Sequence, residues 1–275
     1  MVVETDKCIV SRHTWKKKYP LLKKYFNAYT KVISNNFPRF FYIDGFAGSG
    51  SCVDKNSGQE VDGSPLISLK VKYPFTDYIF VESKKKREVV LERVVKKYSN
   101  LKARCTKNNN NKRGTEINVN IDVIHGDINR EIDKILSEIP RNTPCFIFLD
   151  PEGLELEWPT VGKCSKKERI ELLINFSISG VLRNLQNPRT IEKFFGKKNI
   201  TEKPISKLPM TYLVLYSDLL KQYFKWVIPK PVKISSGNLL YYLIFATNNK
   251  TGYKIMKNVM KIKGIQTKLK EIMRI

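Results

Sequence analysis

The sequence predicts an α/β fold built around a mostly parallel, doubly wound β-sheet, and three observations support this prediction. Short apolar segments alternate with segments of helical periodicity between residues 39 and 177, which is typical of parallel β-α-β units. A loop rich in small residues, 44–50, directly follows the first apolar segment. The chain then changes character, because two apolar segments separated by Gly237 and Asn238 predict a pair of antiparallel strands.

The first 38 residues predict a helical N-terminal extension. Apolar side chains recur at helical spacing between about residues 12 and 35, with lysines on the opposite side. Pro20 suits the first turn of the main helix, and the first strand is expected at about 39–44. Beyond the loop, a helix is expected to begin with Ser64 as its N-cap and Pro65 at the first helical position.

The central part of the chain alternates strands and helices, and two insertions interrupt it. Strands are expected at 77–82, 118–125, 145–150 and 170–177, and helices at 84–98 and 129–138. The polar, Asn-rich segment 104–116 predicts a mobile insertion without chemistry. The segment 186–225 predicts a helical insertion before the last two strands. The whole chain, 1–275, is therefore expected to form a single domain with a class I methyltransferase-like Rossmann fold, in which an antiparallel last strand completes a twisted, mostly parallel sheet.

The composition is that of a globular protein, with 41% hydrophobic and 28% charged residues. No apolar run approaches the ~20 residues that a membrane span requires. The first ten residues carry two acidic side chains before any hydrophobic stretch, so they do not resemble a secretory signal. We therefore expect a cytoplasmic protein without a membrane partner.

The cysteines and histidines argue against a metal site. The five cysteines are odd in number and scattered, no Cys-x-x-Cys spacing occurs, and the chain has two histidines. Neither a disulfide framework nor a bound metal is expected, and the thiols should be reduced in a cytoplasmic protein.

The charge balance predicts a polyanionic partner. Fifty Lys and Arg residues against 26 Asp and Glu residues leave a net charge of +24, and nucleic acid, RNA or DNA, is the partner that such a field favours. The alternative is coding bias, because lysine outnumbers arginine and an Asn run occupies 108–111. Bias of that kind favours lysine over arginine but does not account for the shortage of acidic residues.

The loop Y-I-D-G-F-A-G-S-G predicts a cofactor site. Ligands of doubly wound sheets bind beyond the carboxyl ends of the strands, and small residues there let a ligand approach the backbone. An acid at the end of the strand disfavours a pyrophosphate and favours a cation, such as the sulfonium of S-adenosyl-L-methionine. We also expect this acid to contribute little to the core. The predicted cofactor-binding residues of the loop are Asp44, Gly45, Phe46, Ala47, Gly48 and Gly50.

The order of the glycines, G-x-x-G-x-G, differs from the dinucleotide fingerprint G-x-G-x-x-G. A nicotinamide-dependent oxidoreductase is therefore a remote alternative. Two further acidic positions extend the predicted site. Glu82 ends the second strand of the doubly wound pattern, where a carboxylate can accept both ribose hydroxyls, and Gly126 with Asp127 ends the third, where an acid or a backbone N–H can hold the adenine amino group.

The fourth strand of this pattern ends in the turn D-P-E-G. Asp150 and Pro151 place a carboxylate and a rigid carbonyl where the transferred methyl group would lie, as in the D-P-P-Y-type turn of amine methyltransferases. The bland alternative is an ordinary Asp-Pro turn. Glu152 replaces the second proline, and Gly153 stands where an aromatic residue would stack on a flipped base. Trp158 or Phe46 are other candidates for stacking, although a core role is expected for each.

Taken in order, these motifs resemble those of the three-Cys-motif partner proteins, a family of S-adenosylmethionine-dependent methyltransferase-like proteins. The matching segments span 13–247 and are H-T-W-K-K-K-Y-P-L-L-K-K-Y, Y-I-D-G-F-A-G-S-G, G-S-P-L-I-S-L, F-V-E-S, H-G-D-I-N, F-L-D-P-E-G-L-E and L-L-Y-Y-L-I-F-A-T-N. The resemblance implies a protein partner that carries a three-cysteine motif. The first and fourth motifs also resemble those of adenine-N6 methyltransferases that act on DNA or ribosomal RNA.

The function expected from these observations is methyl transfer from S-adenosyl-L-methionine to RNA or DNA, with a base amine as a possible acceptor. Asp150 would orient the nucleophile, and Glu152 would take up its proton. The alternative from another class is a methyltransferase-like module that binds nucleic acid or a protein without turnover.

Overall fold

The structure is a computed structural model that describes residues 7–10, 14–105, 115–198, 200, 209–233 and 237–261. The start of the predicted first helix, most of the 104–116 insertion, part of the 186–225 insertion and the lysines after 261 lie outside the described residues.

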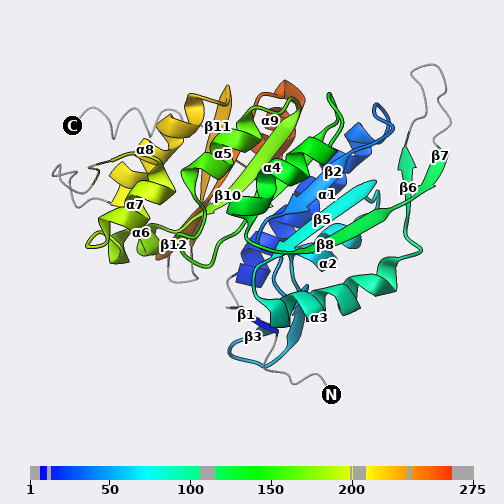
Figure 1. The fold of residues 1–275 in the computed structure, drawn as a ribbon, viewed down its shortest axis with the longest axis horizontal. Coiled ribbons are helices and arrows are strands. Elements are labelled where there is room, and N and C mark those ends of the chain that lie inside the picture. The colour runs from blue at the N-terminus through cyan, green and yellow to red at the C-terminus, as the bar shows by residue number, and fades with distance from the viewer. Residues whose placement is uncertain are drawn as a thin grey trace.

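A seven-stranded sheet forms the centre of the molecule (Figure 1), in the order β11-β12-β10-β9-β2-β5-β8. Five neighbouring strands are parallel, and β12 is antiparallel to both of its neighbours. This order and these directions are those of the class I methyltransferase sheet, so the predicted fold class is confirmed. The strands are β2 (Phe41–Asp44), β5 (Asp77–Glu82), β8 (Asn120–His125), β9 (Cys145–Leu149), β10 (Ile170–Phe176), β11 (Trp226–Lys233) and β12 (Leu239–Thr247).

The burial of the strands follows their places in the sheet. Every residue of β2, β5 and β9 is buried, as expected for central parallel strands covered on both faces. The edge strand β11 begins at Trp226, directly after the predicted insertion, and it contains Pro229 and Pro231. Prolines are tolerated on an edge strand, where one side of the backbone has no partner.

Helices cover both faces of the sheet (Figure 1). One face is covered by α1 (Tyr19–Ile33), α2 (Ser64–Leu69), α3 (Lys85–Val95) and α9 (Lys250–Val259). The other is covered by α4 (Ile128–Glu138), α5 (Trp158–Ser165), α6 (Ile178–Arg183), α7 (Pro188–Phe195) and α8 (Pro209–Lys221). The two hydrophobic cores have no buried residue in common, because the sheet separates them.

Aromatic side chains hold α1 against the sheet. Tyr25 and Phe26 of α1 pack on Phe146 of β9, with ring centroids 5.2 and 5.3 Å apart. Phe26 also meets Tyr42 of β2 edge-on at 5.1 Å. Such ring pairs add to the burial of apolar area, so the N-terminal extension is part of the core and carries its residues to a defined place beside the strand ends.

The N-terminal extension is not wholly helical. Within it, β1 (Cys8–Val10) is the first described strand, and it pairs in parallel with β3 (Ser51–Asp54), which pairs in turn with β4 (Glu60–Asp62). A π-helical turn, Thr14–Lys18, leads into α1. In Figure 1, β1 and β3 lie beneath the central sheet, next to α3. None of these three strands was predicted, because each is only three or four residues long.

Two other expectations are corrected. Ser64 is not the cap of α2: Gly63 is the N-cap and Ser64 is already helical. The flanks of the 104–116 insertion are ordered strands, since β6 (Lys102–Cys105) and β7 (Thr115–Asn118) pair as an antiparallel hairpin.

Candidate active site

A cavity of about 580 Å³ opens at the carboxyl ends of the parallel strands, with β1 forming part of its wall. It brings together residues that are far apart in the chain. Of the residues predicted from the sequence, the cavity is lined by Gly45, Phe46, Ala47, Gly48, Glu82, Gly126, Asp127, Asp150, Pro151 and Glu152, whereas Asp44 and Gly50 lie outside its lining.

Asp44 is a buried structural group and does not form part of the cavity surface. Its side chain has no exposed area. The hydroxyl of Tyr42 donates to Oδ2 at 3.0 Å, and the N–H of Phe46 donates to Oδ1 at 3.3 Å. Burial raises the pKa of this carboxyl to about 7, although hydrogen bonds from Ser64 and Tyr42 act in the opposite direction. The expectation that Asp44 contributes little to the core is therefore wrong.

Because glycines have no side chain, other parts of the protein can pack closely against the glycine loop. A Cβ on Gly48 would lie 2.5 Å from Sγ of Cys8, and a Cβ on Gly50 would lie 2.9 Å from Leu91. Both residues have positive φ, 65° and 77°, a backbone conformation that residues other than glycine rarely adopt. These glycines therefore let β1 and α3 pack against the loop, and Gly48 also lines the cavity.

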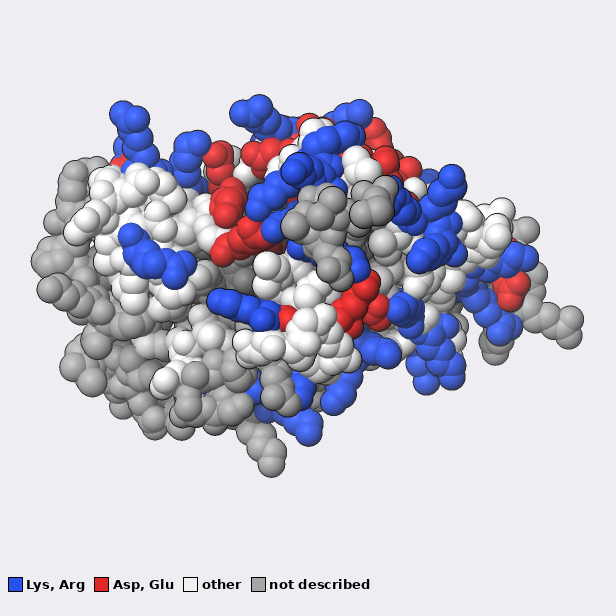
Figure 2. Space-filling model, turned by 90° about the horizontal axis from the view of Figure 1, so that it is seen from below, with Lys and Arg blue, Asp and Glu red and all other residues white. Residues whose placement is uncertain are grey.

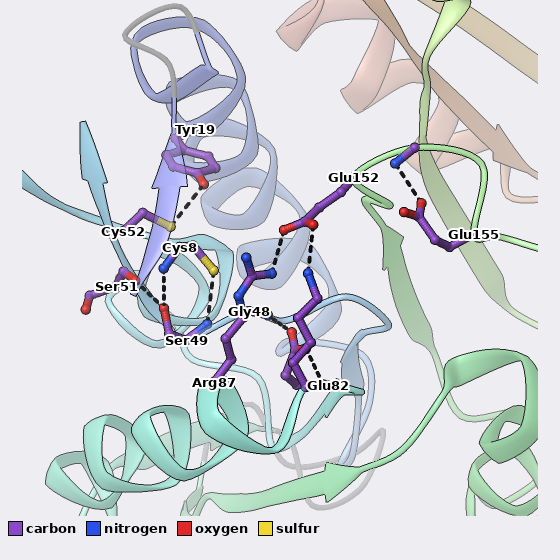
Figure 3. A network of polar contacts seen from close by, with 12 residues as sticks. Cys8, Tyr19, Gly48, Ser49, Ser51, Cys52, Glu82, Arg87, Glu152 and Glu155 are labelled. Carbon is purple, nitrogen blue, oxygen red and sulfur yellow. Dashed lines mark hydrogen bonds and ion pairs between the residues drawn. The ribbon is translucent and has the colours of Figure 1, made fainter. Parts of the chain in front are cut away.

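Glu82 ends β5 and lines the cavity although it is only 6% exposed. The N–H of Gly48 donates to Oε2 at 2.8 Å, and the N–H of Lys84 donates to Oε1 at 2.7 Å (Figure 3). Each carboxylate oxygen can accept more than one hydrogen bond. The side chain is thus locked by two backbone groups and keeps acceptor capacity for a ligand.

Gly126 and Asp127 complete this part of the cavity. The N–H of Gly126 donates to the carbonyl of Glu82 at 3.1 Å, which ties the third strand end to the second. Asp127 caps α4 by accepting the N–H of Asn129 at 2.9 Å. We refer to 45–48, Glu82, Gly126 and Asp127 together as the glycine-loop wall.

Asp150 lines another part of the cavity and forms an ion pair with Lys18. Lys18 is the last residue before α1 and is 4% exposed. Its ammonium group lies 5.6 Å from the ring centre of Tyr241 and 6.0 Å from that of Phe148. Burial by itself would lower the pKa of Lys18, but the charge of Asp150, the hydrogen bond to it and the nearby Tyr241 and Cys52 together outweigh burial, and the pKa is raised. Lys18 is therefore a charged group inside the cavity wall.

The sequence alone does not single out Lys18, because it is one of three consecutive lysines at 16–18 and the lysines of this segment are expected on the side opposite the apolar residues. A signal was present. Lys18 lies three, four and seven positions before Leu21, Leu22 and Tyr25, and these spacings place it on the buried face of the helix.

Asn175 was also missed, and it lies beside Asp150. Ile174 pairs with Leu149 in the register of β10 and β9, so the next residues, Asn175 and Asp150, are neighbours on the same face. Oδ1 of Asn175 is buried and has no hydrogen-bond partner among the described residues. Lys18, Asp150, Asn175 and Tyr241 all line the cavity, and we refer to them as the Lys18 wall.

Glu152 points to the mouth of the cavity, where it pairs with Lys84 at 3.0 Å and with Arg87 (Figure 3). Burial would raise the pKa of Glu152, but the hydrogen bonds from Arg87 and Lys84 lower it below its ordinary value. A carboxylate with a lowered pKa and two cationic partners is a poor proton acceptor. The role of Glu152 as a base stays a prediction.

The two aromatic residues considered for stacking differ in position. Trp158 packs in the core against Tyr216 and Tyr223, with ring centroids 5.3 and 5.8 Å away, so its expected core role is confirmed. Phe46 is half-buried, packs partly on the core and also lines the cavity. Phe46 is therefore the candidate that a ligand can reach.

Basic and acidic side chains both line the cavity. Figure 2 shows the molecule from below the view of Figure 1, and Lys and Arg are spread over much of this face with acidic side chains among them. Lys84, Arg87 and Arg183 belong to the cavity lining itself. The charge is thus distributed over the face that carries α3 and is not confined to one segment.

Comparisons with known proteins find similar structures but no matching family. No family model matches the chain, and no curated protein matches it. Protein LPL1258 from Legionella pneumophila has a TM-score of 0.50 at 12% identity, over 88% of this chain and 90% of that one. Trm1 from Pyrococcus horikoshii, solved with S-adenosyl-L-methionine, has a TM-score of 0.46 at 12% identity, over 93% of this chain and 61% of that one. An rRNA methylase from Streptococcus thermophilus has a TM-score of 0.41 at 7% identity, over 84% of this chain and 93% of that one.

At these identities the likeness concerns the fold alone, and this chain spans less than two thirds of the Trm1 chain. The resemblance to three-Cys-motif partner proteins stays a prediction, since no family model matches. Among the described residues, no helix is both long enough and apolar enough to span a membrane.

Proposed function

We propose that this protein is an S-adenosyl-L-methionine-dependent methyltransferase that acts on nucleic acid. The observation that carries the proposal is the single cavity that joins the glycine-loop wall to the Lys18 wall at the carboxyl ends of a class I methyltransferase sheet. Ligands of open α/β sheets bind at this end of the strands.

The glycine-loop wall fits the adenosyl part of the cofactor. Glu82 has two oxygens in the cavity wall with acceptor capacity left, which suits the two hydroxyls of a ribose. Asp127, exposed at the start of α4, suits an adenine amino group. The backbone of 45–48 lies along the same wall. Asp44 does not contact the ligand directly. It holds the loop in place, because its carboxylate accepts a hydrogen bond from the N–H of Phe46.

The Lys18 wall fits the methyl acceptor. When bound, the cofactor supplies an electrophilic methyl group, and displacement at that carbon chiefly requires a nucleophile held in line with it. Asp150 has one oxygen on Lys18 and a second that can accept a hydrogen bond from the nucleophile. Lys18 orients that carboxylate, so it is a positioning residue. Asn175 lines the same cavity, and its buried Oδ1 has no partner among the described residues. A turn of the amide towards the cavity would make it a second acceptor, and two acceptors suit an –NH₂ group, which has two hydrogens to donate.

The charge supports nucleic acid as the substrate class. A net charge of +24 and cationic side chains at the cavity mouth would attract a phosphate backbone to the place where the acceptor must enter. Phe46 offers an aromatic face inside the cavity for a base turned out of its stack. The three-cysteine-motif partner implied by the sequence resemblance has no counterpart among these features and belongs to the proposal only as an untested expectation.

Two measurements test the proposal. The first is calorimetric titration of the full chain with S-adenosyl-L-methionine and with NAD, and we expect micromolar affinity for the former alone. Binding of NAD alone would overturn the proposal. The second is transfer of tritium from the labelled methyl group to total RNA and to DNA. Cofactor binding without any transfer to RNA or DNA would favour the alternative, a methyltransferase-like module that binds without turnover.

Salt dependence tests the nucleic-acid part separately. Because each neutralised phosphate releases a counterion, affinity for RNA or DNA should fall by orders of magnitude between about 50 and 200 mM salt. A flat response would mean that the basic composition is coding bias and does not form a binding surface.

A further inference from the structure

Two cysteines meet in the wall of the cavity, on strands that are far apart in the chain. Cys8 of β1 and Cys52 of β3 are direct partners in the register of the two parallel strands. Laterally paired residues of neighbouring strands point to the same face and are about 4.8 Å apart. A disulfide requires Cα atoms roughly 4.4–6.8 Å apart, so this pair can be bridged with little movement of the backbone.

The surroundings of Cys8 stabilise a thiolate. The N–H of Ser49 donates to its Sγ at 3.3 Å, and its own N–H donates to Oγ of Ser49 at 2.9 Å (Figure 3). Gly48 has no side chain, and Sγ of Cys8 occupies the space that a Cβ would take. Arg87, which lies in the first turn of α3, adds a positive charge nearby.

The two thiols are not equivalent. Both cysteines line the cavity, but Cys8 is half-buried, whereas Cys52 is buried and its Sγ lies 3.9 Å from the hydroxyl of Tyr19. A hydrogen bond from Cys52, together with those from Ser49 and the charge of Arg87, lowers the pKa of Cys8 to about 6 despite its burial. The same hydrogen bond and burial raise the pKa of Cys52. The accessible sulfur is thus the nucleophile and the buried one keeps its proton.

We propose that Cys8 and Cys52 are a reactive thiol pair that a peroxide oxidises to a disulfide in the wall of the cavity. The Cys8 thiolate attacks one oxygen of the peroxide, forms an S–O bond and breaks the O–O bond, which leaves a sulfenic acid and releases hydroxide. The Cys52 thiol then attacks the sulfur of that sulfenic acid, the S–S bond forms, and water leaves with the Cys52 proton. Two thiols are oxidised and the peroxide is reduced.

The bond would fasten β1 to β3 beside the glycine-loop wall. Cys8, Ile9 and Val10 all line the cavity, so the disulfide would form in the part of the wall that β1 supplies. This inference does not depend on methyl transfer, because it concerns only the thiols and the oxidant.

The test is a peptide map of the full chain after treatment with a few equivalents of hydrogen peroxide, without reductant. We expect one linked pair of peptides, containing Cys8 and Cys52, that is lighter by two hydrogens than their sum. Cys164→Ser removes a thiol buried on the other face of the sheet and should give the same linked pair. A map in which both thiols stay reduced, or in which Cys8 is linked elsewhere, would overturn the proposal.

A second measurement isolates the first step. In Cys52→Ser the reaction should stop at the sulfenic acid of Cys8, which dimedone traps. Since that variant removes a buried side chain, alkylation of the unmodified chain by iodoacetamide at about pH 6.5 provides an independent check. There we expect Cys8 to react at least ~10-fold faster than the same residue in the unfolded chain, because more of it is thiolate. Equal rates would contradict the proposal.

Discussion

The two walls of the cavity are built in different ways. In the glycine-loop wall, the acidic side chains are held by backbone N–H groups of neighbouring turns, as Glu82 is by Gly48 and Lys84. In the Lys18 wall, side chains from separate elements hold one another, and Oδ1 of Asn175 has no partner among the described residues. An unpaired buried acceptor costs about 1–3 kcal/mol.

The difference indicates which of the two walls has its polar groups hydrogen-bonded before a ligand binds. The glycine-loop wall satisfies its own polar groups and is preorganised. The Lys18 wall keeps an ion pair and an unsatisfied acceptor inside the protein, an arrangement that a donor from a ligand would relieve. Changes in the two walls should therefore separate binding from turnover.

The largest effect is expected for Asp150→Ala. If Asp150 orients the nucleophile, methyl transfer should fall at least ~10²-fold while affinity for S-adenosyl-L-methionine stays nearly unchanged. Tritium transfer and calorimetry measure the two quantities on the same preparation. Transfer at the full rate would contradict the role of Asp150.

This substitution also removes the partner of a buried ammonium group. Leaving Lys18 unpaired should cost about 3–5 kcal/mol of stability. The double variant Lys18→Met with Asp150→Leu is the matched control, because it removes both charges at once. Recovery of stability without recovery of transfer would assign the lost activity to the carboxylate and not to unfolding.

A smaller effect, on binding, is expected for Glu82→Gln in the glycine-loop wall. The neutral amide weakens the hydrogen bonds from the N–H groups of Gly48 and Lys84 and offers a ribose one acceptor oxygen in place of two. We expect the Kd for S-adenosyl-L-methionine to rise about 10- to 100-fold. Glu92→Gln, on the same side of the molecule but outside this cavity, is the control. Unchanged affinity in the Glu82 variant would remove the residue from the site.

The next effect is a pH dependence that distinguishes two ligands. The pKa of Asp44 is about 7 because of burial, so a cationic ligand nearby should bind better as pH rises and the carboxyl ionises. S-adenosyl-L-homocysteine lacks the sulfonium charge and provides the matched comparison. The ratio of the two affinities should shift towards the sulfonium by up to about tenfold between pH 6 and 8. A ratio independent of pH would show that Asp44 does not sense the ligand charge.

Glu171, near the start of β10, provides the control for that pH experiment. Its ionisation should not change the affinity for either ligand. This carboxyl is buried, accepts a hydrogen bond from Asn249 at 3.1 Å and another from Tyr25, and burial raises its pKa to about 7. Its folded pKa thus exceeds its unfolded one. The stability that it contributes is complete below about pH 4.5 and is lost as pH rises towards and through 7, by roughly 3 kcal/mol at most.

Glu171→Gln should flatten this slope in denaturant titrations at several pH values and leave the ratio of ligand affinities unchanged. A change in that ratio would mean that the pH dependence comes from the fold and not from Asp44.

Much of the fold could be predicted because its signals are local. The alternation of apolar strands and amphipathic helices, and the antiparallel pair at the end, are patterns of period two and 3.6 that need no tertiary information. The strand ends at Asp44, Glu82 and Leu149 were predicted within one residue for the same reason. Local signals failed where an element is very short, as in β1.

The sequence by itself determined which strands end in an acidic residue and where the glycine loop follows a strand. Both features are motifs within a few residues of a strand end. Only the tertiary structure decided which of these groups reach the cavity. Asp44 is turned into the core, and Gly48 and Gly50 make room for Cys8 and Leu91. Lys18 and Asp150, 132 positions apart, meet because the packing of α1 on the sheet brings them together. Burial and long-range pairing depend on that packing, and no short segment of the chain contains it.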